Sequence, residues 1–67
     1  MNLKLLREKA GLKPHELAVT LGVHPLTVTR WEKGTSRIPA DIVQTLAKVY
    51  HTTELEILEA LKNREAS

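Results

Sequence analysis

Residues 14–32, PHELAVTLGVHPLTVTRWE, hold the pattern that decides how this chain folds. Apolar residues stand at helical spacing in both halves of the stretch, with Leu17, Ala18 and Leu21 in the first half and Val28 and Trp31 in the second. Gly22 interrupts the pattern between the halves, where a glycine favours a change of chain direction. The stretch therefore predicts two short helices that meet at a sharp corner.

Three residues specify this corner. The small Ala18 lets the second helix cross the first closely, and Gly22 can adopt the left-handed backbone conformation at little cost. Val23 follows and is expected to fill the corner from the inside. Residue types at these offsets predict a helix-turn-helix unit, whose second helix is presented outward for a groove.

The surrounding sequence, LREKAGLKPHELAVTLGVHPLTVTRWEKG, resembles the Xre-type branch of phage repressors and Cro proteins. A Leu-Arg pair, a Gly-Leu corner, E-L-A, L-G-V and W-E-x-G recur there in this order. The resemblance runs from about Leu3 to Leu58. It implies an all-α fold, a compact five-helix bundle with a helix-turn-helix, as in lambda repressor-like DNA-binding domains.

The length of 67 residues allows one small domain, which we expect over residues 1–62, with a flexible C-terminal tail over 63–67. Because the chain has no cysteine, disulfides and thiolate metal sites are excluded. No apolar run approaches the roughly 18 residues of a membrane span, and the N-terminus lacks the order of a signal peptide. We therefore expect no membrane association and a cytoplasmic, nucleoid-associated protein.

Charge is unevenly distributed along the chain. Residues 1–37 carry seven Lys or Arg against three Glu, a net charge of +4, whereas residues 38–67 carry three against five acids, a net charge of −2. The basic part coincides with the helix-turn-helix, and basic side chains displace counterions from phosphates. This asymmetry supports nucleic-acid binding, although an ordinary solvated basic surface is the alternative.

Helix signals flank the central unit on both sides. Leu3, Leu6 and Ala10 predict a helix over 3–10, and Pro14 suits the first position of the next helix, after a poor N-cap, Lys13. Pro39 is expected to open a fourth helix that carries Ile42, Leu46 and Val49. Thr53-Glu54-Leu55-Glu56 reads as a capping box that starts a fifth helix.

The fifth helix has more apolar residues than one core stripe needs. We expect Leu55 and Leu58 to complete the core. Ile57 and Leu61 are then left either for a homodimer contact on DNA or for a frayed edge of the core.

The resemblance assigns DNA contacts residue by residue. Positions that meet base edges in the family are occupied here by Pro25, Leu26, Thr27 and Arg30. Backbone contacts are expected near the starts of the second and third helices and in the loop after the third, from Lys13, His15, His24, Thr29, Lys33, Thr35, Ser36 and Arg37. For Thr35 and Ser36 a plain solvent-exposed loop is the alternative.

Side-chain chemistry ranks these residues. The guanidinium of Arg30 can bond bidentately to guanine O6 and N7, which contributes about 1–3 kcal/mol of discrimination, and Leu26 and Thr27 can offer methyl groups to thymine. The family often has hydrogen-bonding side chains where this chain has Pro14, Pro25 and Leu26. Either the target is thymine-rich near the helix start, or this surface binds protein.

The resemblance also implies a structural ion pair between Arg7 and Glu32, which would tie the first helix to the third. Two ordinary surface charges are the alternative. Arg suits a half-buried bidentate pair better than Lys does.

No constellation of residues indicates catalysis. His15, His24 and His51 lack metal-ligand spacing, and no glycine-rich phosphate loop is present. We expect no enzyme activity, no metal, no cofactor and no evident small-molecule ligand. The preferred function is sequence-specific binding of double-stranded DNA by a transcriptional regulator, a repressor; the alternative is a helical protein-interaction module that retains the fold without sequence-specific DNA binding.

Overall fold

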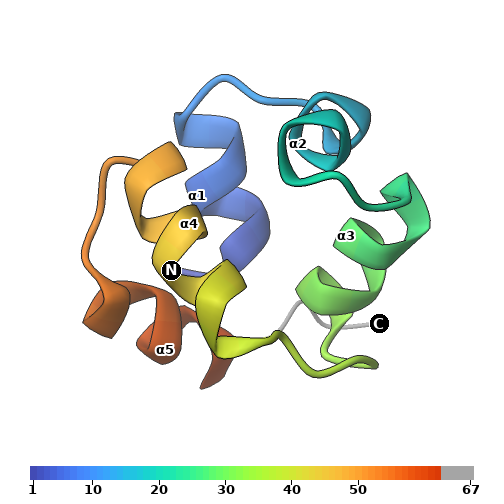
Figure 1. Cartoon of the computed structure of the whole chain (residues 1–67). Helices are drawn as coiled ribbons and strands as arrows, with labels where there is room; N and C mark the ends of the chain where they lie inside the picture. Colours follow the sequence, from blue (N-terminus) through green and yellow to red (C-terminus); the bar gives the residue numbers. More distant parts are fainter. Residues whose placement is uncertain (63–67) are drawn as a thin grey trace.

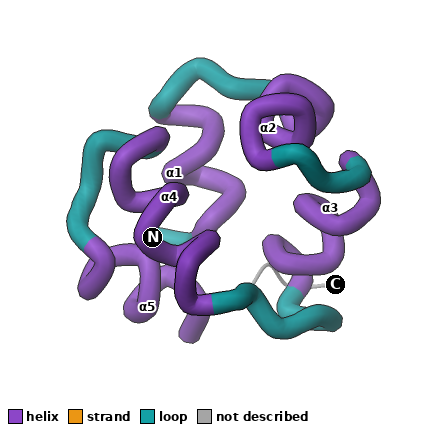
Figure 2. The backbone as a smooth tube through the Cα atoms, viewed as in Figure 1, coloured by secondary structure: helices purple, strands orange, loops and turns teal. Residues whose placement is uncertain are grey.

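A computed structural model describes residues 1–62 and contains five helices, shown in Figure 1: α1 (Leu3–Lys9), α2 (Pro14–Leu21), α3 (Pro25–Lys33), α4 (Ala40–Val49) and α5 (Glu54–Lys62). Short loops join them, and no strand occurs within these residues (Figure 2). The predicted all-α, five-helix fold is confirmed. The tail expected over 63–67 lies outside the described residues.

The helices pack in two groups around one core. Figure 1 shows α2 and α3 together on one side and α1, α4 and α5 on the other, and the strongest packing is of α2 on α3 and of α4 on α5. Both groups supply the core, whose buried apolar residues are Leu3, Leu6, Leu17, Ala18, Val28, Trp31, Val43, Leu46, Ala47, Tyr50, Ile57 and Ala60. No helix of the described part is both long and apolar enough to cross a membrane.

Side chains just before α1 and α5 accept orphan backbone N–H groups. Asn2 Oδ1 accepts from the N–H of Leu5 at 2.9 Å before α1, and Thr53 Oγ1 accepts from the N–H of Glu56 at 3.1 Å before α5. The expected capping box is only half formed, because the carboxylate of Glu56 accepts from the hydroxyl of Thr52. Pro39 stands just before α4 rather than in its first turn.

A residue in the left-handed conformation closes each of the first four helices. Three of these residues are glycines, at φ of 71° to 77°, and the fourth is His51 at φ 56°. At the end of α4, the N–H of Thr52 donates to the carbonyl of Ala47 at 2.9 Å, and at Gly22 the N–H of Val23 donates likewise to Ala18. The same turn is thus built with and without glycine, and His51 holds a conformation that costs a side-chain-bearing residue about 1 kcal/mol.

The predicted orientation of α5 is wrong. Ile57 is fully buried, whereas Leu55 is 64% and Leu58 50% exposed. The buried residues Ile57 and Ala60 are three positions apart and share one face with the half-buried Leu61, so a small alanine supplies the core contact that leucine was expected to make. Ile57 therefore cannot contribute to a contact between two folded copies.

Candidate nucleic-acid interface

The turn between α2 and α3 fixes the angle at which α3 leaves the core. Leu17 and Ala18 of α2 and Val28 of α3 are each only 1% exposed, so the two helices meet through tightly packed side chains. Gly22 adopts the left-handed conformation at φ 71°, as the sequence predicted. Val23 is partly buried against the core. The inner side of α3 is therefore fixed by packing against the core, and its outer side is exposed to solvent.

An exposed stripe runs along the outer side of α3. Leu26, Arg30 and Lys33 are four and three residues apart and share this face. Pro25 is exposed at the start of the helix, while Thr27 and Thr29 are half-buried at the borders. We call Leu26, Arg30 and Lys33 the outer stripe.

The basic side chains of this stripe are not engaged within the protein. No hydrogen bond or ion pair to another residue of the described chain holds the guanidinium of Arg30 or the ammonium of Lys33. By contrast, the hydroxyl of Thr29 donates to the carbonyl of Pro25 at 3.4 Å, and that of Thr35 donates to the carbonyl of Arg30 at 3.3 Å. The two threonine hydroxyls thus support the helix, while Arg30 and Lys33 keep their donors available.

The imidazole of His24 has a role at the start of α3 beyond the predicted phosphate contact. Its Nδ1 accepts the N–H of Leu26 at 3.0 Å, which caps the helix. Because Nδ1 is the acceptor, the remaining nitrogen, Nε2, carries the proton in the neutral ring. The exposed His24 therefore caps α3 and presents one N–H donor to solvent. A polar residue directly before an N1 proline was the available sequence signal.

Glu16 has a similar role at the start of α2. Its Oε1 accepts the backbone N–H of Lys13 at 2.8 Å, which satisfies a group that the lysine side chain cannot cap. Lys13 and His15 remain exposed beside this helix start. Ser36 and Arg37 are exposed in the loop after α3, together with Thr35.

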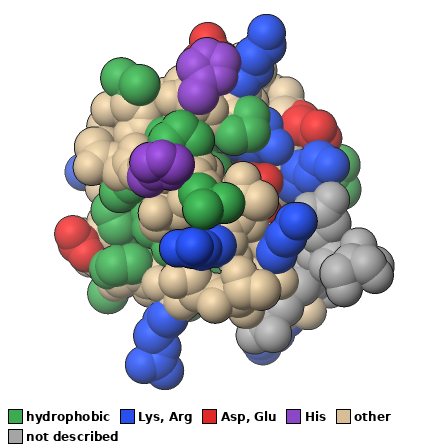
Figure 3. Space-filling view, turned by 90° about the vertical axis from the view of Figure 1, so that its right-hand side faces the viewer, with side chains coloured by type: hydrophobic (Ala, Val, Ile, Leu, Met, Phe, Trp, Pro, Cys, Tyr) green, Lys and Arg blue, Asp and Glu red, His purple; other side chains and the backbone are tan. Residues whose placement is uncertain are grey.

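Exposed charge over this region is predominantly basic. Residues 13–37 contain four Lys or Arg and two Glu, and one of the two acids, Glu32, is buried in an ion pair. That leaves four exposed bases against Glu16. Figure 3 shows the α3 side of the molecule, where histidine, basic and apolar side chains gather in the middle of the view. This mixture suits phosphate contact around a partly apolar centre.

A buried ion pair joins α1 to α3 behind the exposed face. The Nε of Arg7 donates to Oε2 of Glu32 at 2.6 Å, and a second guanidinium nitrogen donates to Oε1 at 3.3 Å. A third donates to the carbonyl of Leu12 at 2.9 Å. Arg7 is 6% and Glu32 8% exposed. The hydrogen bonds to Glu32 raise the pKa of Arg7 above its ordinary value, so the guanidinium stays charged.

The expected contact residues fall into groups in the structure. Pro25, Leu26 and Arg30 are exposed on α3, and Thr27 lies at the border. Lys13, His15, His24, Lys33 and the loop residues 35–37 are also exposed around the two helix starts and the end of α3. Within residues 1–62, no group of three or more His, Asp or Glu is placed to hold a metal ion.

Two short helices that cross at a glycine turn, with the second exposed and braced from behind, define a helix-turn-helix domain. The chain belongs to the helix-turn-helix family, whose model matches residues 3–58. This is the Xre and lambda repressor-like branch, whose members are DNA-binding transcription regulators. Comparison with curated proteins gave no match, and comparison with solved structures gave none.

Proposed function

We propose that the chain binds double-stranded DNA sequence-specifically by placing α3 in the major groove, and that it represses transcription by occupying its site. The observation that carries this proposal is the outer stripe. The planar guanidinium of Arg30 has no partner within residues 1–62, and Val28 and Trp31 bury the opposite side of its helix. An exposed guanidinium on a helix fixed from behind can bond bidentately to guanine O6 and N7, the contact that base readout requires.

Base readout in this proposal is divided between one hydrogen-bonding residue and several apolar ones. Arg30 recognises guanine, and Leu26, which is 48% exposed four residues earlier, contacts the methyl group of thymine together with Pro25. Thr27 contributes its methyl from the border of the face. The preferred site then has a thymine near the start of the helix and a guanine one turn further along it.

Contacts to the sugar-phosphate backbone surround this readout. At the starts of α2 and α3, the backbone is contacted by the side chains of Lys13 and His15 and by the exposed N–H of His24. At the end of α3 and in the loop after it, the backbone is contacted by Lys33 and Arg37. Thr29, Thr35 and Ser36 lie between them and complete the proposed set. Such contacts fix the register of the helix on DNA and carry no sequence information themselves.

Pairing of two copies on DNA is the second part of the proposal. Ile57 is excluded by its burial, and the exposed leucines of α5 take its place. Glu54 and Lys62 stand at opposite ends of the same helix, eight residues apart. Two α5 helices that cross antiparallel about a two-fold axis therefore bring Leu55 and Leu58 together and each Glu54 near the partner subunit's Lys62.

Fluorescence anisotropy with labelled duplexes at a series of salt concentrations tests the DNA-binding proposal. Binding should weaken steeply with salt, and Lys33→Ala should weaken all duplexes alike and reduce the magnitude of the salt slope by about 1. Lys48→Ala, which removes an exposed lysine from α4, is the matched control and should leave the slope unchanged. Binding that is absent or insensitive to salt would favour the protein-interaction module instead.

A further inference from the structure

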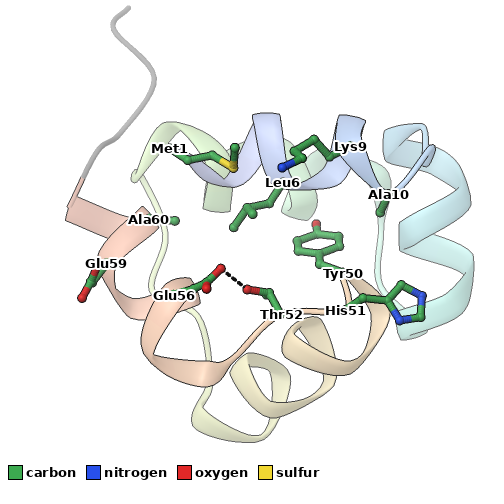
Figure 4. A pocket seen from close by; sticks show the side chains of 10 residues that line it. All are labelled: Met1, Leu6, Lys9, Ala10, Tyr50, His51, Thr52, Glu56, Glu59 and Ala60. Atoms are coloured by element: carbon green, nitrogen blue, oxygen red, sulfur yellow. Dashed lines mark hydrogen bonds between the residues drawn. The ribbon is translucent and has the colours of Figure 1, made fainter.

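A cleft lies outside the helix-turn-helix, between α1, the turn after α4, and α5. Its volume is about 590 Å³, within the range of small-molecule sites. Figure 4 shows its lining, which contains no residue of α2 or α3. A molecule bound there leaves the outer stripe of α3 uncovered.

The hydroxyl of Tyr50 is a polar group of this cleft that has no hydrogen-bond partner within the described chain. The side chain is 8% exposed, and its hydroxyl makes no hydrogen bond to another residue of the described chain. No side-chain oxygen of these residues is both fully buried and unpaired, so the hydroxyl is accessible, and Tyr50 is one of the residues that line the cleft. In Figure 4 the ring stands beneath α1 with its oxygen turned toward that helix.

The Tyr50 hydroxyl remains a donor over the whole physiological range. Burial, followed by the nearby carboxylate of Glu32, raises the pKa of Tyr50 well above its ordinary value, and the positive charge of Arg7 only partly opposes this. An accessible donor without a protein partner can bond to an acceptor that enters the cleft.

Opposite charges stand on the two sides of the cleft. Lys9 carries its ammonium along α1, on the side to which the Tyr50 hydroxyl points, and Glu56 lies on α5 across from it (Figure 4). No ion pair joins Lys9 to a carboxylate within residues 1–62. The side chains of Leu6 and Ala60 contribute apolar surface to the lining of the same cleft. Glu59 is turned outward.

We propose that this cleft binds a small zwitterion of dipeptide length with apolar side chains. Its carboxylate accepts from Tyr50 and pairs with Lys9, its ammonium pairs with Glu56, and its apolar body covers Leu6 and Ala60. A lone carboxylate would leave Glu56 as a repulsive neighbour, and a lone cation would face Lys9. A molecule that carries both charges, separated by several bonds, satisfies both sides of the cleft.

Leucyl-leucine is the probe, titrated to millimolar concentration into the ¹⁵N-labelled full-length protein and followed by NMR. Saturable shifts should centre on residues 6–10, 50–52 and 56–60. N-acetyl-leucyl-leucine, which lacks the ammonium, and leucyl-leucinamide, which lacks the carboxylate, should each bind about tenfold more weakly because each loses one charged hydrogen bond. Shifts that do not saturate, or that centre on α2 and α3, would overturn the proposal.

Three variants separate the site from a general effect on folding. Tyr50→Phe keeps the ring and should weaken leucyl-leucine binding about tenfold, as should Lys9→Met and Glu56→Gln, which change exposed residues. Lys48→Met is the matched control and should bind as the parent does. Unchanged binding by the three variants overturns the assignment. The result stands apart from the DNA-binding proposal, because the titration contains no DNA.

Discussion

Arg7 and Glu32 lie 25 positions apart in the sequence, yet the guanidinium of one meets the carboxylate of the other at 2.6 Å in the interior. The pair connects α1 to the last turn of α3, the helix that carries the outer stripe. The orientation of α3 thus depends on a charge pair as well as on apolar packing, since Glu32 directly follows the buried Trp31 in the chain.

Loss of one member of this pair should be strongly destabilising. Arg7→Met leaves the carboxylate of Glu32 buried without its partner, and Glu32→Met does the same to the guanidinium of Arg7, so we expect each to lower the free energy of unfolding by about 3–5 kcal/mol. The double variant Arg7→Met/Glu32→Met should recover much of this loss. Urea unfolding followed by circular dichroism measures the three values, and simple additivity of the two single changes would contradict the pairing.

A substitution at His51, the left-handed residue after α4, should stabilise the protein. His51→Gly removes the steric penalty at φ 56° and should raise the free energy of unfolding by about 1 kcal/mol, or the midpoint temperature by about 4–8 °C. Gly22→Ala is the mirror-image control: an added Cβ meets no atom within 4 Å, so any loss, about 1 kcal/mol, comes from the backbone alone. A destabilised His51→Gly would show that the imidazole has a role beyond its backbone position.

The orientation of α5 can be tested by truncating its two apolar faces separately. Ile57→Ala removes a fully buried side chain and should lower the free energy of unfolding by about 2–5 kcal/mol. Leu55→Ala, two residues earlier and mostly exposed, should change it by less than about 0.5 kcal/mol. Thermal unfolding of the two variants at equal concentration decides, and equal losses would contradict this orientation.

Tyr50 is the sole tyrosine, which makes its ionisation directly measurable. Folding raises its pKa above the ordinary value of 10.0, because burial penalises the phenolate. The neutral form is therefore favoured in the folded state, and its contribution to stability is complete below about pH 10 and is lost as the pH rises above it. Tyrosinate absorbance near 295 nm should appear only together with unfolding; ionisation of the folded protein near pH 10 would refute the burial argument.

The sequence predicts the parts of this fold that local rules govern. The helices and the turn between α2 and α3 are predicted by local signals: leucines at helical spacing, Gly22 at the corner, and prolines at the starts of α2 and α3. The face of α5 does not, because Leu55, Ile57, Leu58 and Leu61 fit more than one helical stripe. Packing against the rest of the core selects Ile57, and the small Ala60 fits where a larger residue would not.

The site divides in the same way. The exposed stripe on α3 follows from the buried positions of Val28 and Trp31, since the opposite face of a helix must point outward. The cap at His24 and the bond from Glu16 to the backbone of Lys13 depend on side-chain geometry, which residue type alone does not fix. The cleft beside Tyr50 is lined by residues from both ends of the chain, so no local sequence pattern predicts it.

Selection of bound sequences from a random duplex pool tests the central claim most directly, with the parent protein and Arg30→Ala in parallel. The account predicts one enriched motif for the parent, with a guanine and a nearby thymine, and the loss of preference at the guanine alone for Arg30→Ala. A pool that stays random with the parent protein, or an unchanged motif with Arg30→Ala, would contradict it.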